Sequence, residues 1–220
     1  MSKKYKAILF DYDGTLIDTN QRIIDSWDHM YFKHFGGHIT GDEVKWTFGI
    51  VLRDAIAEEM RRRGHTDVDV DELVASYREY QIPVCATPAP PFEGVAETIK
   101  ELKARGVKLA IVTSRGRNTC EAGLKEYGML DCFDYIVAAE STDIHKPLPE
   151  PVLIALRELD IAPEDALMVG DSIFDLQCGN NAGCDSCFVT WSYATSLKTA
   201  QAEGHPTIVI DTPQQLLDLV

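Results

Sequence analysis

The sequence predicts an α/β protein: a doubly wound, Rossmann-like parallel sheet with an inserted α-helical subdomain. Three observations support this fold class. From about residue 92 onward, short apolar runs alternate with amphipathic helical patterns. Most of the runs are continuously apolar, as expected for parallel strands that are covered on both faces. With 220 residues, 45% of them hydrophobic, the chain is long enough to bury a sizeable core.

Six apolar runs are predicted as strands, and the first of them lies alone before the helical subdomain. The other five follow it and are separated by helical patterns. The runs are YKAILF at 5–10, VKLAIVT at 107–113, DYIVAA at 134–139, ALMVG at 166–170, SCFVTW at 186–191 and TIVID at 207–211.

The helical patterns between the later runs carry start and stop signals. GVAETIKELKARG places Val95, Ile99 and Leu102 on one face and ends at Gly106, a natural helix stop. The patterns at 119–129 and 150–161 are similar. At the C-terminus, Thr212 is a candidate N-cap and Pro213 a candidate first residue, which predicts a helix over 212–220.

Residues of about 18 to 90 interrupt the alternation of strand and helix. Amphipathic patterns at 20–35, 52–64 and 70–82 have no convincing strand between them. Four prolines in the nine residues from Pro83 to Pro91 then predict a stiff linker. We therefore predict a core domain of residues 1–17 and 91–220 and a helical domain of residues 18–90.

The charge of the chain limits its partners. Lys and Arg total 21 against 35 Asp and Glu, so the net charge is -14, which argues against a nucleic-acid or anionic membrane surface. No stretch approaches the length of a membrane span, and the apolar run after MSKKYK is too short for a signal peptide, so we expect a cytoplasmic protein.

The cysteines are scattered, which favours reduced thiols over a disulfide framework. They are Cys85, Cys120, Cys132, Cys178, Cys184 and Cys187. A zinc or redox site in CGNNAGCDSC is the alternative, but no nearby His or second cysteine pair supplies a fourth zinc ligand.

Four aspartates follow predicted strands at the edge where parallel sheets bind ligands. Asp11 and Asp13 follow the first run, Asp171 follows ALMVG, and Asp175 comes four residues later as a helix begins. Their carboxylates would repel one another strongly unless a cation lay among them, and hard oxygen ligands suit Mg²⁺. All four are candidate Mg²⁺ ligands.

The same edge offers groups that bind phosphate. Thr113 and Ser114 end the second run with hydroxyl and backbone N–H groups, and Lys146 brings an ammonium beside Pro147. Gly14 and Thr15, directly after Asp13, complete the predicted contacts to substrate in the core. The predicted partner is therefore a small phosphorylated metabolite.

DYDGT, the strand ending in Thr113, Lys146-Pro147 and GDSIFD resemble the four ordered motifs of the haloacid dehalogenase superfamily of phosphohydrolases. The helical segment is similar to that superfamily's small α-helical cap. The resemblance implies that Asp11 is the nucleophile, which becomes an aspartyl phosphate, and that Asp13 is the general acid and base. It also implies that Thr113 and Lys146 bind the transferring phosphoryl group.

The resemblance further implies that Asp171 completes the Mg²⁺ shell with Asp11, while the backbone carbonyl of Asp13 also faces the metal. It leaves Asp175 as a direct ligand, a water-mediated ligand or the partner of Lys146. The cap would act as a lid with hinges near Leu16–Asn20 and Ala86–Glu93.

Within the superfamily, the chain most resembles the phosphoglycolate phosphatases and related pyrophosphatases. The dehalogenases lack an acidic residue two positions after the nucleophile, where this chain has Asp13. The β-phosphoglucomutase branch has a histidine twelve positions after the nucleophile, where this chain has Ile23. In FGIVLRDAI, Gly49 would allow a turn over the site and Arg53 would contact a substrate carboxylate or a second phosphate.

The predicted activity is Mg²⁺-dependent hydrolysis of a small phosphomonoester, with 2-phosphoglycolate first. The alternatives are an inorganic pyrophosphatase, a sugar-phosphate phosphatase, a β-phosphoglucomutase-like phosphotransferase and, from another class, a non-catalytic binding module. The oligomeric state cannot be read from the sequence.

Overall fold

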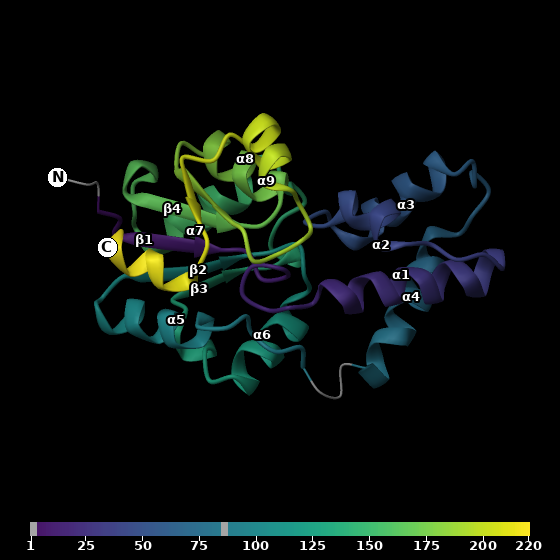
Figure 1. Cartoon of the computed structure of the whole chain (residues 1–220), viewed down its shortest axis with the longest axis horizontal. Coiled ribbons are helices and arrows are strands. Elements are labelled where there is room, and N and C mark those ends of the chain that lie inside the picture. Colours follow the sequence, from purple (N-terminus) through teal and green to yellow (C-terminus); the bar gives the residue numbers. More distant parts are fainter. Residues whose placement is uncertain (1–3, 85–87) are drawn as a thin grey trace.

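The structure is a computed structural model that describes residues 4–84 and 88–220. Its centre is a six-stranded parallel sheet in the order β3-β2-β1-β4-β5-β6 (Figure 1). All six predicted strands are present, so the predicted α/β fold class is confirmed. The strands are β1 (Ala7–Phe10), β2 (Lys108–Val112), β3 (Tyr135–Val137), β4 (Ala166–Gly170), β5 (Asp185–Val189) and β6 (Ile208–Ile210).

Nine α-helices are assigned within the described residues, together with a π-helix at Ala200–Gly204. Short 3-10 helices occupy Lys45–Thr47, Leu130–Cys132, Ala139–Ser141, Pro163–Asp165 and Pro213–Asp218. The α-helices are α1 (Asn20–Phe35), α2 (Gly41–Val44), α3 (Leu52–Arg62), α4 (Val70–Val84), α5 (Val95–Ala104), α6 (Arg117–Glu126), α7 (Glu150–Leu159), α8 (Ile173–Asn181) and α9 (Leu197–Thr199). None of the described helices has the length and apolar character of a membrane span.

Both faces of the sheet are buried, as its continuously apolar strands require. Because side chains alternate along a strand, Ile8 and Phe10 face one cluster with α5 and α6, while Ala7 and Leu9 face another with α7 and α8. Figure 1 shows these helix pairs on opposite sides of the sheet. The result is a three-layer core that holds the ends of the strands rigidly.

The strand order reverses between β1 and β4, which lie side by side in the middle of the sheet. Phe10 is in register with Val169, and the backbone N–H of Asp11 donates to the Val169 carbonyl at 3.0 Å. Ligands of open α/β sheets bind beyond the carboxyl ends of the strands at such a switch point. Asp11 and Asp171, which leave these two strands, are therefore brought to the same place.

Helices α1 to α4, which we call the cap, lie beyond that edge of the sheet (Figure 1). They share a hydrophobic cluster of their own, in which Trp27 and Met30 of α1 pack with Ile56 of α3 and Tyr77 of α4. The predicted domain boundaries at residues 17/18 and 90/91 stay a prediction. Residues 86 and 87 of the second predicted hinge, and Cys85, lie outside the described residues.

Several predicted helix bounds differ from the structure by two or three residues, as at the ends of α3 and α6. Helix α4 runs to Val84, two residues beyond the predicted pattern. The predicted C-terminal helix is a 3-10 helix over Pro213–Asp218. Its buried residues, Pro213 and Leu216, are three positions apart, and a 3-10 helix with three residues per turn places such a pair on one face against α5.

Candidate active site

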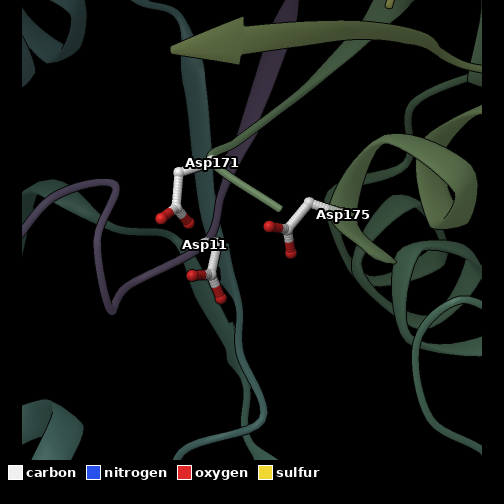
Figure 2. Close-up of side chains that lie close together, drawn as sticks. All are labelled: Asp11, Asp171 and Asp175. Atoms are coloured by element: carbon white, nitrogen blue, oxygen red, sulfur yellow. The ribbon is translucent and has the colours of Figure 1, made fainter. Parts of the chain in front are cut away.

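Three buried carboxylates meet beyond the ends of β1 and β4. Asp11 follows β1, Asp171 follows β4, and Asp175 lies in the first turn of α8. One oxygen of each lies within 4.8 Å of the others, and Figure 2 shows the carboxylates directed toward a shared space. All three residues are at most 3% exposed. The structure thus brings together three of the four predicted metal ligands, which we call the acidic trio.

The start of α8 fixes the orientation of Asp175. Ser172 is the N-cap, and its Oγ accepts from the Asp175 N–H at 3.3 Å. In return, Asp175 Oδ2 accepts from the Ser172 N–H at 3.1 Å and from its hydroxyl at 2.6 Å. This reciprocal capping uses one carboxylate oxygen and leaves Oδ1 directed toward the trio.

Lys146 joins the trio from the loop before α7. Its Nζ donates to Asp11 Oδ1 at 2.7 Å, to Asp175 Oδ1 at 2.6 Å and to the Val112 carbonyl at 3.3 Å. The Lys146 side chain is 2% exposed. Asp175 is therefore a partner of Lys146, which was one of its predicted roles, and it remains near enough to the other carboxylates to share a cation.

The trio carries more negative charge than Lys146 neutralises. Burial, followed by the charge of Asp175, raises the pKa of Asp171 to about 7. Burial also raises the pKa of Asp11 well above its ordinary value, although Lys146 opposes this shift. Burial would lower the pKa of Lys146, but Asp11 and Asp175 outweigh it and raise this pKa. A divalent cation held by oxygen ligands would balance the remaining charge, so the trio fits Mg²⁺.

The raised pKa of Asp171 predicts an unusual pH dependence of stability. Without a bound ion, the folded protein holds a proton up to about pH 7 that the unfolded chain loses near pH 3.8. Between these values the folded state binds more protons, so the free energy of unfolding falls as pH rises from about 4 to 7. Mg²⁺ binding should release protons at pH 6 and release few at pH 8.

Calorimetry of Mg²⁺ binding at pH 6, in buffers with different ionisation enthalpies, measures this proton release. Asp171→Asn removes the titrating group and is the control, so its proton release should be clearly smaller. Equal proton release in the two proteins would show that Asp171 is not the group that titrates.

Gly14 and Thr15 pack against Asp171. Gly14 has a φ of 79°, and a Cβ atom there would lie 2.2 Å from Asp171 Oδ2. Thr15 Oγ1 donates to Asp171 Oδ1 at 3.3 Å. The structure therefore places both predicted substrate-binding residues beside a carboxylate of the trio, where they fix its position.

We expect Gly14→Ala to displace Asp171. Gly106→Ala is a matched control, because Gly106 has a φ of 82° and no atom within 4 Å of a Cβ built there. In both variants, an alanine in a left-handed backbone conformation should lower the free energy of unfolding by about 1 kcal/mol. Only Gly14→Ala should also weaken Mg²⁺ binding, by about ten-fold or more, since it moves a ligand. Calorimetry and thermal unfolding of both variants test this, and equal Mg²⁺ affinity would contradict it.

Thr113 and Ser114 leave β2 beside the trio. Thr113 is 6% exposed, and its Oγ1 accepts from the Arg115 N–H at 3.1 Å. The Ser114 hydroxyl donates to the Gly49 carbonyl at 2.6 Å. Gly49 has a φ of 90°, and a Cβ there would lie 2.6 Å from Ser172 Oγ. The predicted turn at Gly49 thus brings the cap against the site.

The carboxylate of Asp13 lies outside the trio. Its Oδ1 accepts from Arg115 Nη1 at 2.9 Å, and the Arg115 guanidinium lies 5.3 Å from the centre of the Tyr12 ring. The side chain of Asp13 is 24% exposed. Arg115 was missed in the sequence, although a cation directly after the Thr113–Ser114 pair in an acidic chain was a usable signal.

Arg53 is not brought to the trio in this structure. Its side chain is 59% exposed, and its Nε donates to Asp71 Oδ1 at 2.9 Å. Exposed pairs of this kind contribute little to stability. A contact between Arg53 and substrate stays a prediction.

Comparisons with known proteins agree with this site. The haloacid dehalogenase-like hydrolase family matches residues 8–189, a range that contains the trio, Thr113 and Lys146. Pyrophosphatase PpaX from Bacillus thuringiensis (strain Al Hakam) is 35% identical over 218 residues, 99% of this chain and 97% of that protein.

Two solved structures share the fold. A predicted phosphoglycolate phosphatase from Haemophilus somnus 129pt has a TM-score of 0.84 at 22% identity and covers 98% of this chain and 97% of its own. The β-phosphoglucomutase of Clostridium difficile has a TM-score of 0.82 at 19% identity and covers 96% and 93%. The family match extends over most of the chain, and together with the full-length pyrophosphatase relative it shows that the chain belongs to the haloacid dehalogenase-like hydrolase family.

Proposed function

We propose that the chain is a Mg²⁺-dependent phosphohydrolase that works through an aspartyl phosphate on Asp11. The observation that supports this proposal is the acidic trio around Lys146 at the switch point of the sheet. The Asp11 carboxylate at this site accepts from the Lys146 ammonium and could also share a metal ion with Asp171. Mg²⁺ bound there would supply charge that offsets the repulsion between a carboxylate and an anionic phosphoryl group.

The residues of this chain would prepare the attack of Asp11 on phosphorus. Lys146 holds Asp11 Oδ1 and fixes the direction of its carboxylate. The groups at the end of β2, including Thr113 and Ser114, lie where they could accommodate the oxygens of the transferred phosphoryl group. Because such transfer depends mainly on position and charge, a preorganised site of this kind is what catalysis requires.

Asp13 is the proposed proton donor to the leaving oxygen and then the base for the water that hydrolyses the aspartyl phosphate. Asp13 follows Asp11 by two residues, and its side chain is partly exposed; both features suit this role. In the present arrangement its carboxylate pairs with Arg115. This pair would hold the ionised form that acts as the base, and it would have to open for Asp13, with its carboxyl protonated, to serve the leaving oxygen.

Two substrates are proposed. The relative that shares 35% of its residues along almost the whole chain is named a pyrophosphatase, which supports inorganic diphosphate as the first substrate. The sequence motifs favoured 2-phosphoglycolate, which is the second. Both present a phosphoryl group on a small, anionic leaving group, so the core chemistry would be the same and the cap would select between them.

Turnover of purified protein with Mg²⁺ tests the proposal. Inorganic diphosphate, 2-phosphoglycolate, glucose 1-phosphate and a nucleoside monophosphate should be compared by kcat/KM, with phosphate release as the measurement. We expect diphosphate or 2-phosphoglycolate to exceed the other two by at least about ten-fold, which is 1.4 kcal/mol of discrimination. No phosphate release from any of them would overturn the proposed function.

A further inference from the structure

We infer that Asn20 and Ser192 are positioning residues that orient the metal ligand Asp171 and connect it to the first helix of the cap. This inference rests on the metal site of the proposed function. The two residues lie outside the four sequence motifs: Asn20 is at the start of α1, and Ser192 is in the loop after β5. They are 172 positions apart in the chain.

The two residues form a buried chain of hydrogen bonds. Ser192 Oγ donates to Asp171 Oδ2 at 2.6 Å, and Asn20 Nδ2 donates to Ser192 Oγ at 3.1 Å. The exposed fractions are 1% for Asn20, 8% for Ser192 and 3% for Asp171. Because these groups are removed from water, the bonds are stronger than they would be at the surface.

The hydrogen bonds run from donor to acceptor in one direction, from Asn20 through Ser192 to Asp171. A serine hydroxyl has one proton, and Ser192 Oγ already accepts from Asn20 Nδ2 and, at 3.4 Å, from the Ala194 N–H. Its own proton is therefore left for Asp171. When Asp171 is ionised, this is a charge-assisted bond to one carboxylate oxygen, while Thr15 donates to the other at 3.3 Å. Both oxygens of Asp171 are thus held in place before any ion binds.

Asn20 makes this bond from the cap side. It is the first residue of α1 and the last of the predicted hinge at Leu16–Asn20. Its Oδ1 is buried and has no hydrogen-bond partner among the described residues. Movement of α1 would break the Asn20–Ser192 bond, so the position of the cap helix and the orientation of Asp171 are linked, and the link acts in both directions.

Mg²⁺ titration without substrate tests the inference. We expect Ser192→Ala to bind Mg²⁺ about ten-fold more weakly by calorimetry, as for other residues that orient a ligand, and Ser192→Thr to restore much of the affinity. Asn20→Ala should weaken binding less, because Ser192 remains. Ser186→Ala is the matched control: Ser186 is fully buried on β5 and its hydroxyl has no partner among the described residues, so affinity should not change.

Hydrogen exchange measures the link to the cap. In the wild-type protein, Mg²⁺ should slow exchange of amides in the first two turns of α1, and Asn20→Ala should abolish this effect while the rest of α1 is unchanged. A merely structural asparagine would raise exchange equally with and without Mg²⁺. Wild-type affinity in Ser192→Ala, or full Mg²⁺ protection in Asn20→Ala, would overturn the inference alone. Failure of the wild-type protein to bind Mg²⁺ would overturn the proposed function as well.

Discussion

Replacing Asp11 with asparagine is expected to lower turnover of the best substrate by a factor on the order of 10⁴ or more, because it removes the proposed nucleophile. The fold should survive. Asparagine has the same shape, its Oδ1 can still accept from Lys146, and Lys146 keeps Asp175 as a partner. The trio also loses one of its three negative charges, so thermal stability without metal should be unchanged or higher.

Steady-state phosphate release and thermal unfolding measure these two effects. Asp171→Asn separates the roles of nucleophile and ligand, since its activity should rise with added Mg²⁺ while that of Asp11→Asn should not. Acid quenching of the wild-type protein during turnover should trap a phosphoryl group that hydroxylamine removes, and Asp11→Asn should trap none. Substantial activity in Asp11→Asn would show that another group attacks phosphorus.

The strands and the acidic trio could be predicted because their determinants are local in the chain. Continuous apolar runs define buried parallel strands, and the parallel arrangement itself brings residues that follow β1 and β4 to one edge. Asp11 and Asp171 therefore met in space as expected. The same holds for Lys146, whose ammonium could reach the trio only from a loop at that edge.

The features that were missed depend on contacts between distant segments. Asn20 and Ser192 meet only after α1 and the loop after β5 have packed, and nothing in either stretch marks the pair. The ion pair between Asp13 and Arg115 joins residues 102 positions apart. At the C-terminus, the apolar spacing fitted an α-helix and a 3-10 helix alike, and the segment that packs against α5 is a 3-10 helix.

Lys146→Met is expected to be the most destabilising single change in the site. Methionine nearly matches the length of the lysine stem but leaves three buried carboxylates without a cation, which should lower the free energy of unfolding by about 3–5 kcal/mol at pH 8. The loss should be smaller at pH 5, because Asp171, with a pKa of about 7, is then protonated in the folded state. Chemical denaturation at the two pH values measures the difference.

The same variant tests whether the trio holds Mg²⁺. With Lys146 gone, Mg²⁺ would supply the positive charge that the trio has lost, so Mg²⁺ at 100 times its dissociation constant should restore about 2.7 kcal/mol. Lys6→Met is the matched control: its Nζ also lies 2.7 Å from a carboxylate, that of Asp165, but its side chain is 67% exposed. Because water already screens that pair, Lys6→Met should change the free energy of unfolding little at either pH, with or without Mg²⁺. A Lys146→Met protein as stable as wild type at pH 8 without Mg²⁺ would mean that the carboxylates are not ionised together, and the electrostatic argument for a metal site would fail with it.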